Sequence, residues 1–193
     1  MKKLLFINAC IRREESRTLA VAKPILQKLA ERYEIQQLDL TDDDRLPVTA
    51  TLFARRGQEG LSAEDLEAGR LVAEADRIVI AAPFWDMSFP AVLKVFFEHI
   101  SAPDLTFVNL EDGNTKGNCR AERLLLITTR GMEIPTGSPL DQGTSYLKAL
   151  GWLWGIPQVD TVAAWGMDVT DEETRTRRLE LAVAEGLKIS EDF

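Results

Sequence analysis

Apolar residues recur along the chain in short runs that alternate with longer amphipathic stretches. The runs at 3–9, 77–82 and 122–129 are almost continuously apolar, which is typical of strands buried on both faces of a sheet. Alternating apolar and polar positions predict a further strand at 34–40, and the segment 158–164 predicts a fifth.

Between these runs the apolar positions follow helical spacing. Ser16 stands where an N-cap is expected, before apolar residues at 19, 21, 25, 26 and 29, and Pro24 should kink that helix or start it afresh. The capping box at 62–65 predicts a helix to about residue 75. Further helices are expected at 90–100, 145–154 and 171–189, whereas the polar segment 42–61 is interpreted as a variable excursion.

Strands that alternate with helices predict a parallel sheet with helices on both faces. Five strands favour a single α/β domain over residues 1–193, a flavodoxin-like three-layer sandwich with strand order 2-1-3-4-5. In that topology a ligand lies beyond the carboxyl ends of the first, third and fourth strands. The loops after those strands are therefore the candidate site.

Composition narrows the function classes. The chain has 23 basic and 31 acidic residues, and its net charge of −8 disfavours nucleic acid as a partner. No apolar run approaches the ~20 residues needed to span a bilayer, and the N-terminal apolar run is interpreted as a strand rather than a signal peptide. Two cysteines are too few for a disulfide framework, so we expect a cytoplasmic enzyme or binding protein.

The loop after the first strand has the composition of an anion site. A helix N-terminus presents unpaired N–H groups and a partial positive charge, which suits a phosphate. Ser16 and Thr18 add hydroxyl groups, Glu14 and Glu15 are expected to point to solvent, and positive charge comes from Arg12, Arg13 and Arg17. The alternative is an ordinary solvated turn that ends in a serine cap.

The loop after the third strand, Pro83–Pro90, holds three aromatic residues and a methionine between two prolines. Aromatic faces offer a stacking wall for a planar ligand. Packing against the core or against a second subunit would equally explain them.

The loop after the fourth strand, Thr128–Met132, contains a glycine that allows backbone N–H groups to approach a ligand closely. By itself such a glycine is more simply explained as an ordinary strand-to-loop residue.

These loops together resemble those of the flavodoxin-like FMN-dependent NAD(P)H oxidoreductases, the azoreductase and quinone-reductase family. The family's Pro-x-Tyr-Asn-Phe-x-x-Pro loop and following helix correspond to PFWDMSFP and AVLKVFFEHI, and its Ser-Arg-Gly-Gly loop to residues 129–132. Further matches, within a likeness that runs from about residue 3 to 167, are Thr106-Phe107, Gly113, Gly117, Tyr146-Leu147, Leu150-Gly151 and Gly155-Ile156.

The resemblance implies bound FMN that accepts a hydride from NADH or NADPH and passes electrons to a quinone, azo or nitroaromatic acceptor. It implies a homodimer whose active sites lie at the subunit boundary. No side chain is assigned as catalytic and no metal is expected. The residues expected to bind the cofactor are Cys10, Arg12, Ser16, Arg17, Thr18, Pro83, Phe84, Trp85, Asp86, Met87, Thr129, Arg130, Gly131 and Met132.

Several positions depart from the family pattern. The first loop is poorer in serine, Asp86 replaces the usual asparagine, and Met87 replaces an aromatic residue. A flavodoxin-like FMN-binding or regulatory protein with little or no turnover is therefore the alternative function. His99, the only histidine, is expected to be a packed or capping residue, and the tryptophans at 152, 154 and 165 to be core or subunit contacts.

Overall fold

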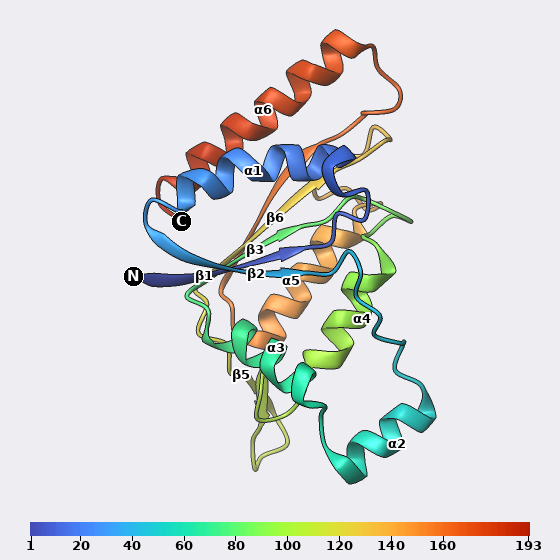
Figure 1. The fold of residues 1–193 in the computed structure, drawn as a ribbon, viewed down its shortest axis with the longest axis vertical. Coiled ribbons are helices and arrows are strands. Elements are labelled where there is room, and N and C mark those ends of the chain that lie inside the picture. The colour runs from blue at the N-terminus through green and yellow to red at the C-terminus, as the bar shows by residue number, and fades with distance from the viewer.

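The computed structural model describes residues 1–193 and contains a parallel sheet with the predicted topology (Figure 1). Its order, β2-β1-β3-β6-β7, corresponds to 2-1-3-4-5 among the five predicted strands. The strands are β1 (Lys2–Asn8), β2 (Tyr33–Asp39), β3 (Arg77–Ala81), β6 (Arg123–Thr129) and β7 (Gln158–Ala164). The predicted fold class is therefore confirmed.

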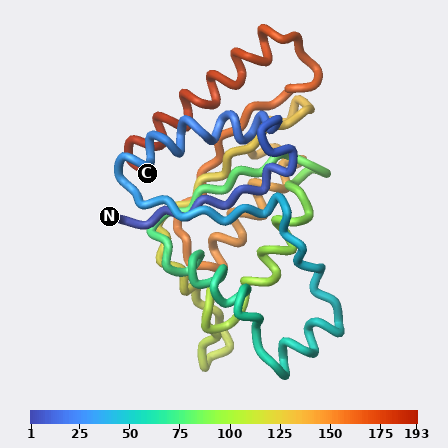
Figure 2. The backbone as a smooth tube through the Cα atoms, in the orientation of Figure 1, coloured from blue at the N-terminus to red at the C-terminus, as the bar shows by residue number.

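Helices cover both faces of this sheet, as the backbone trace shows (Figure 2). One layer consists of α1 (Arg17–Leu29) and α6 (Glu172–Ser190), and the other of α3 (Ala63–Glu74), α4 (Ala91–Ile100) and α5 (Gln142–Trp154). The sheet separates two buried clusters, because successive strand residues point to opposite faces. In β1, Leu5 and Ile7 face α3–α5, while Leu4 and Phe6 face α1 and α6.

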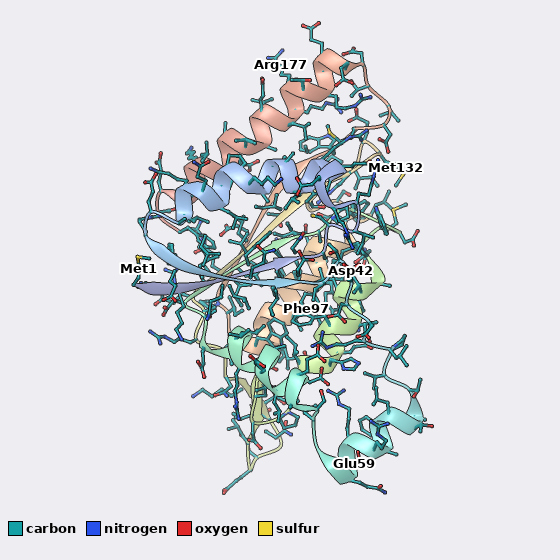
Figure 3. All side chains as sticks on the ribbon, in the orientation of Figure 1. Met1, Asp42, Glu59, Phe97, Met132 and Arg177 are labelled. Carbon is teal, nitrogen blue, oxygen red and sulfur yellow. The ribbon has the colours of Figure 1, made fainter.

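The buried cluster between the sheet and helices α3–α5 contains several aromatic side chains. Phe97, labelled in Figure 3, packs edge-on against Phe89 and Trp154, with ring centroids 5.9 and 5.6 Å apart. Trp154 is fully buried, so it is a core residue, whereas Trp152 on the same helix is 76% exposed. The prediction that the tryptophans are core or subunit contacts is therefore confirmed for Trp154 in the core, and a subunit contact of Trp152 stays a prediction.

Polar side chains cap the N-termini of α1 and α5 and fix where these helices begin. The Ser16 hydroxyl accepts a hydrogen bond from Leu19 N–H at 3.2 Å, which confirms the predicted cap of α1. Helix α5 begins at Gln142, earlier than the predicted Ser145, because the Asp141 carboxylate accepts from Thr144 N–H at 3.1 Å. The prediction missed this turn because its buried residues are Gly143 and Thr144 rather than large apolar side chains.

Pro24 does not divide α1, which runs without a break from Arg17 to Leu29. The expectation of a restarted helix is wrong. A proline removes one backbone hydrogen bond from a helix. Here the helix is held against the sheet on both sides of the proline by Val21 and Ile25, which are buried.

The segment 42–61, interpreted as an excursion, contains a helix, α2 (Ala50–Glu59), which projects from the body of the molecule (Figure 1). Thr49 caps it, and the Arg56 guanidinium donates to the His99 carbonyl. None of its residues is buried, and only Leu52 and Phe53 among its ten residues are large and apolar, so the segment was interpreted as polar. The interpretation was wrong for these ten residues.

Two short strands were not predicted. β4 (Phe107–Asn109) and β5 (Thr115–Gly117) form an antiparallel pair beside the end of α5. A Cβ atom at Gly117 would lie 2.0 Å from the Gly155 nitrogen, and Gly155 itself has φ +80° where it ends α5. Both glycines are thus required by close backbone approach and a left-handed turn.

Candidate functional site

A pocket of about 160 Å³ lies beyond the carboxyl ends of β1, β3 and β6, where the topology predicts a ligand. It joins the three candidate loops with a fourth, the loop after β7. Its lining residues are Arg12, Glu15, Ser16, Arg17, Thr18, Pro83, Phe84, Trp85, Thr129, Arg130, Gly131, Met167 and Asp168. Four of the predicted site residues do not line it: Cys10, Asp86, Met87 and Met132.

The N-terminus of α1 forms one wall of this pocket. The backbone N–H groups of Arg17 and Thr18 have no hydrogen-bond acceptor within the protein. The Thr18 hydroxyl lies 2.7 Å from the Thr129 hydroxyl, which ties the helix start to the carboxyl end of β6. Two unpaired N–H groups at the positive end of a helix dipole make this wall suited to an anion.

The two arginines at this wall are already paired with carboxylates of the same pocket. Arg17 donates through Nη1 to Asp168 Oδ1 at 2.7 Å, and Arg12 donates through Nη2 to Glu15 Oε2 at 3.4 Å. Glu15 is exposed, as expected, but it also lines the pocket. Sequence reasoning missed Asp168, because it follows a strand whose loop has no distinctive composition.

Arg130 lines the pocket, but its side chain is fully buried and turned toward the protein. It donates to the Ile134 carbonyl at 2.9 Å and to Asp141 Oδ2 at 3.0 Å, and it lies 4.9 Å from the centre of the Phe84 ring. Its guanidinium therefore supports the pocket wall from behind.

Asp141 balances the Arg130 charge and lies at the start of α5. Burial by itself raises the pKa of the Asp141 carboxyl, but it is outweighed by hydrogen bonds from Gly137 and Thr144 and by the Arg130 charge. The net pKa is below the ordinary value, so Asp141 is ionised at neutral pH.

The loop Pro83–Pro90 divides its aromatic residues between two roles. Phe84 and Phe89 are buried, whereas Trp85 is 43% exposed. Phe84 and Trp85 both line the pocket, and Phe89 does not. At the tip, Asp86 and Met87 adopt φ of +47° and +64°, between Trp85 and Ser88, which exchange backbone hydrogen bonds. Such a turn carries backbone strain at non-glycine residues. Trp85 is the more exposed of the two aromatic residues that line the pocket.

Cys10 and His99 lie outside the pocket. Burial raises the pKa of the Cys10 thiol to about 11, and its Sγ donates weakly to the Ala81 carbonyl at 3.5 Å. His99 is packed as predicted, with Nδ1 3.0 Å from Asp65 Oδ2 and Nε2 2.9 Å from the Leu46 carbonyl oxygen. No group of three or more His, Cys, Asp and Glu side chains is arranged to hold a metal ion.

In addition, none of the helices combines the length and the apolar character needed to cross a membrane.

Comparisons with known proteins agree with this architecture. A family model described as a flavodoxin-like fold matches residues 2–187. An FMN-dependent NADH:quinone oxidoreductase of Clostridium acetobutylicum is 31% identical over 182 residues, 90% of each chain, and another of Clostridium perfringens is 30% identical over 177 residues, 88% of each.

Solved structures show the same fold. An FMN-dependent NADH-azoreductase from Bacillus anthracis, determined in complex with FMN, superimposes with a TM-score of 0.82 at 25% identity, over 100% of this chain and 99% of that one. A second azoreductase of that species gives a TM-score of 0.84 at 19% identity, with both chains fully covered. Together with the match over residues 2–187 and the two clostridial relatives, this shows that the chain belongs to the flavodoxin-like family that includes the FMN-dependent NADH:quinone oxidoreductases.

Proposed function

We propose that this protein is an FMN-dependent oxidoreductase that passes electrons from NADH to a quinone or azo acceptor. The observation that carries the proposal is the pocket itself, in which the start of α1 meets the loops after β3 and β6. The clostridial relatives and the Bacillus azoreductase, whose names state FMN and NADH, support the same assignment.

The residues at the start of α1 fit the phosphate of FMN. The unpaired N–H groups of Arg17 and Thr18 supply two donors, and the Ser16 hydroxyl and the Arg12 and Arg17 guanidinium groups supply more. Arginine here provides the positive charge in a loop with few hydroxyl groups. Phosphate binding is thus assigned to this wall.

The opposite wall fits the ring system. Phe84, held by Arg130, and the partly exposed Trp85 offer aromatic surface, and Gly131 brings backbone close to the same space. When bound, FMN supplies the hydride-accepting and electron-donating chemistry. The protein's own contribution is to bind and orient: the pocket's carboxylates are paired with arginines, and no side chain is assigned as a proton donor.

The donor and the acceptor are separate parts of the proposal. We propose NADH as the donor because the relatives are named for it, with NADPH as the alternative that an assay must compare. A quinone or azo compound is the proposed acceptor, and a nitroaromatic compound is a further candidate. The proposed location is the cytoplasm.

The test is to add FMN to the purified protein and follow its colour. The proposal expects a yellow protein that bleaches with NADH in the absence of oxygen and regains its colour when a quinone is added. Bound FMN that stays yellow with both NADH and NADPH would instead support the alternative, an FMN-binding or regulatory protein. A protein that does not bind FMN would refute the enzyme and leave only a flavodoxin-like regulatory protein.

We also propose a homodimer whose active sites lie at the subunit boundary. The pocket, about 160 Å³, is smaller than the roughly 300–1,000 Å³ usual for ligand pockets, so one chain by itself encloses only part of a flavin nucleotide. Trp85 in the pocket wall and Trp152 on α5 are exposed, and a second subunit that covered them would remove their apolar surface from water. Light scattering should give twice the 21.6 kDa chain mass, and a monomer with full NADH-oxidising activity would contradict the shared site.

A further inference from the structure

Both arginines proposed to meet the phosphate are paired with carboxylates that line the same pocket. The Arg17–Asp168 pair is the shorter, at 2.7 Å against 3.4 Å for Arg12–Glu15. It also joins two distant parts of the chain, whereas Arg12 and Glu15 lie three residues apart on one turn. Asp168 is therefore the carboxylate most firmly placed against the anion wall.

The position of Asp168 is set by its backbone. Its N–H donates to the Gly131 carbonyl at 3.0 Å, and its carboxylate occupies the space beside Gly131, where a Cβ would lie 2.3 Å from Oδ2. The absence of a side chain at 131 thus gives the carboxylate room to reach Arg17. Asp168 is 67% exposed on its side chain, so it is also free to swing outward.

A phosphate monoester carries about −1.5 to −2 charges at neutral pH, so a carboxylate on the same wall opposes its binding. We propose, resting on the function proposed above, that Asp168 competes with the FMN phosphate for Arg17 and thereby weakens the affinity of the protein for FMN. Asp168 is thus an affinity-determining residue that holds Arg17 when the phosphate is absent and releases it when the phosphate binds.

The test compares FMN affinity, measured by quenching of flavin fluorescence, in the wild type and in Asp168→Asn. The variant keeps the backbone bond to Gly131 and removes the competing charge, and it should bind FMN about fivefold more tightly, the most that an exposed pair of this kind usually contributes. Riboflavin, which lacks the phosphate, should bind equally well to both. The gain for FMN should shrink as salt is added.

Two further variants isolate the cause. Asp42→Asn is the matched control, because Asp42 is an exposed partner of Arg13 at the same end of the molecule and does not line the pocket; its FMN affinity should stay at the wild-type value. In an Arg17→Gln background, Asp168→Asn should give a much smaller gain, because the contested arginine is gone and only the direct repulsion between the carboxylate and the phosphate is relieved.

The outcomes separate this inference from the function on which it rests. Wild-type protein that binds FMN, with Asp168→Asn equal or weaker, would overturn the competition. An equal gain for riboflavin, or a full gain in the Arg17→Gln background, would overturn it as well. Failure of the wild type to bind FMN at all would refute the proposed function itself.

Discussion

Replacing Asp141 with asparagine should destabilise the folded protein, because Arg130 would keep a buried charge that nothing balances. Both side chains of this pair are 0% exposed. Asp141 Oδ2 accepts from Arg130 at 3.0 Å and from Gly137 N–H at 2.9 Å, while Oδ1 accepts from Thr144 N–H. Asparagine retains one oxygen acceptor, so the change removes the charge and one set of these bonds.

Breaking a buried ion pair by removing one partner lowers the free energy of unfolding by about 3–5 kcal/mol. Since asparagine preserves the volume and part of the bonding, we expect a loss near the lower end, about 3 kcal/mol. This is a large share of the total, because domains of this kind have unfolding free energies of about 5–15 kcal/mol. With a urea dependence of about 2 kcal/mol per molar, the unfolding midpoint should fall by about 1.5 M.

Urea unfolding of the flavin-free protein, followed by circular dichroism, measures this loss. Glu59→Gln is the control: it removes a carboxylate from the exposed Arg55–Glu59 pair and should change the unfolding free energy by less than about 0.5 kcal/mol. Adding Arg130→Met to Asp141→Asn should recover part of the loss, because the unbalanced charge is then removed.

Acidification provides a second check on Asp141. Its folded-state pKa lies below the ordinary value, since hydrogen bonds from Gly137 and Thr144 and the Arg130 charge outweigh the opposing effect of burial. The stabilisation is therefore present above the unfolded-state pKa of about 4 and is lost as the pH falls through the folded-state pKa. The difference between wild type and Asp141→Asn should narrow in that range. An Asp141→Asn midpoint equal to that of Glu59→Gln at neutral pH would refute the reasoning.

Three further predictions concern the pocket and the thiols. Ser16→Ala removes the cap of α1 and a phosphate donor, so the unfolding free energy should drop by about 1 kcal/mol and FMN should bind more weakly; unchanged FMN affinity would contradict the phosphate assignment. Trp85→Ala should weaken FMN binding and alter flavin fluorescence. Trp152→Ala, which also replaces an exposed tryptophan, should lower the affinity for FMN far less than Trp85→Ala does. Burial raises the pKa of Cys10 to about 11 and of Cys119 to about 12, so a thiol reagent at pH 8 should label neither rapidly until the protein is unfolded.

The strands and their order could be predicted because a strand buried on both faces is almost continuously apolar. β1 shows this: Leu4 and Phe6 enter one cluster, Leu5 and Ile7 the other. Helix α2 could not be found in the same way, because its ten residues include only two large apolar side chains, Leu52 and Phe53, and none of its residues is buried against the sheet. The short strands β4 and β5 were missed because three residues are too few to show a period.

The location of the pocket could be predicted from the sequence, but the residues that line it could be predicted only in part. The topology located it, and loop composition named Ser16, Arg17 and Trp85, which all line it. The inward direction of the Arg130 side chain could not be predicted, because it depends on Asp141, eleven residues away in a different element. Asp168 could not be identified as a pocket residue from the sequence, because its role depends on a contact with Arg17 that forms only in the folded structure.

The two contacts that close the pocket join residues far apart in the sequence. Thr18 and Thr129 are separated by 111 positions, and Arg17 and Asp168 by 151. Because closing such long loops costs entropy, we expect the pocket to be completed late in folding. A chain in which β7 and the loop after it have not yet folded lacks one wall of the FMN pocket. FMN should therefore slow unfolding of the finished protein while leaving its refolding rate unchanged.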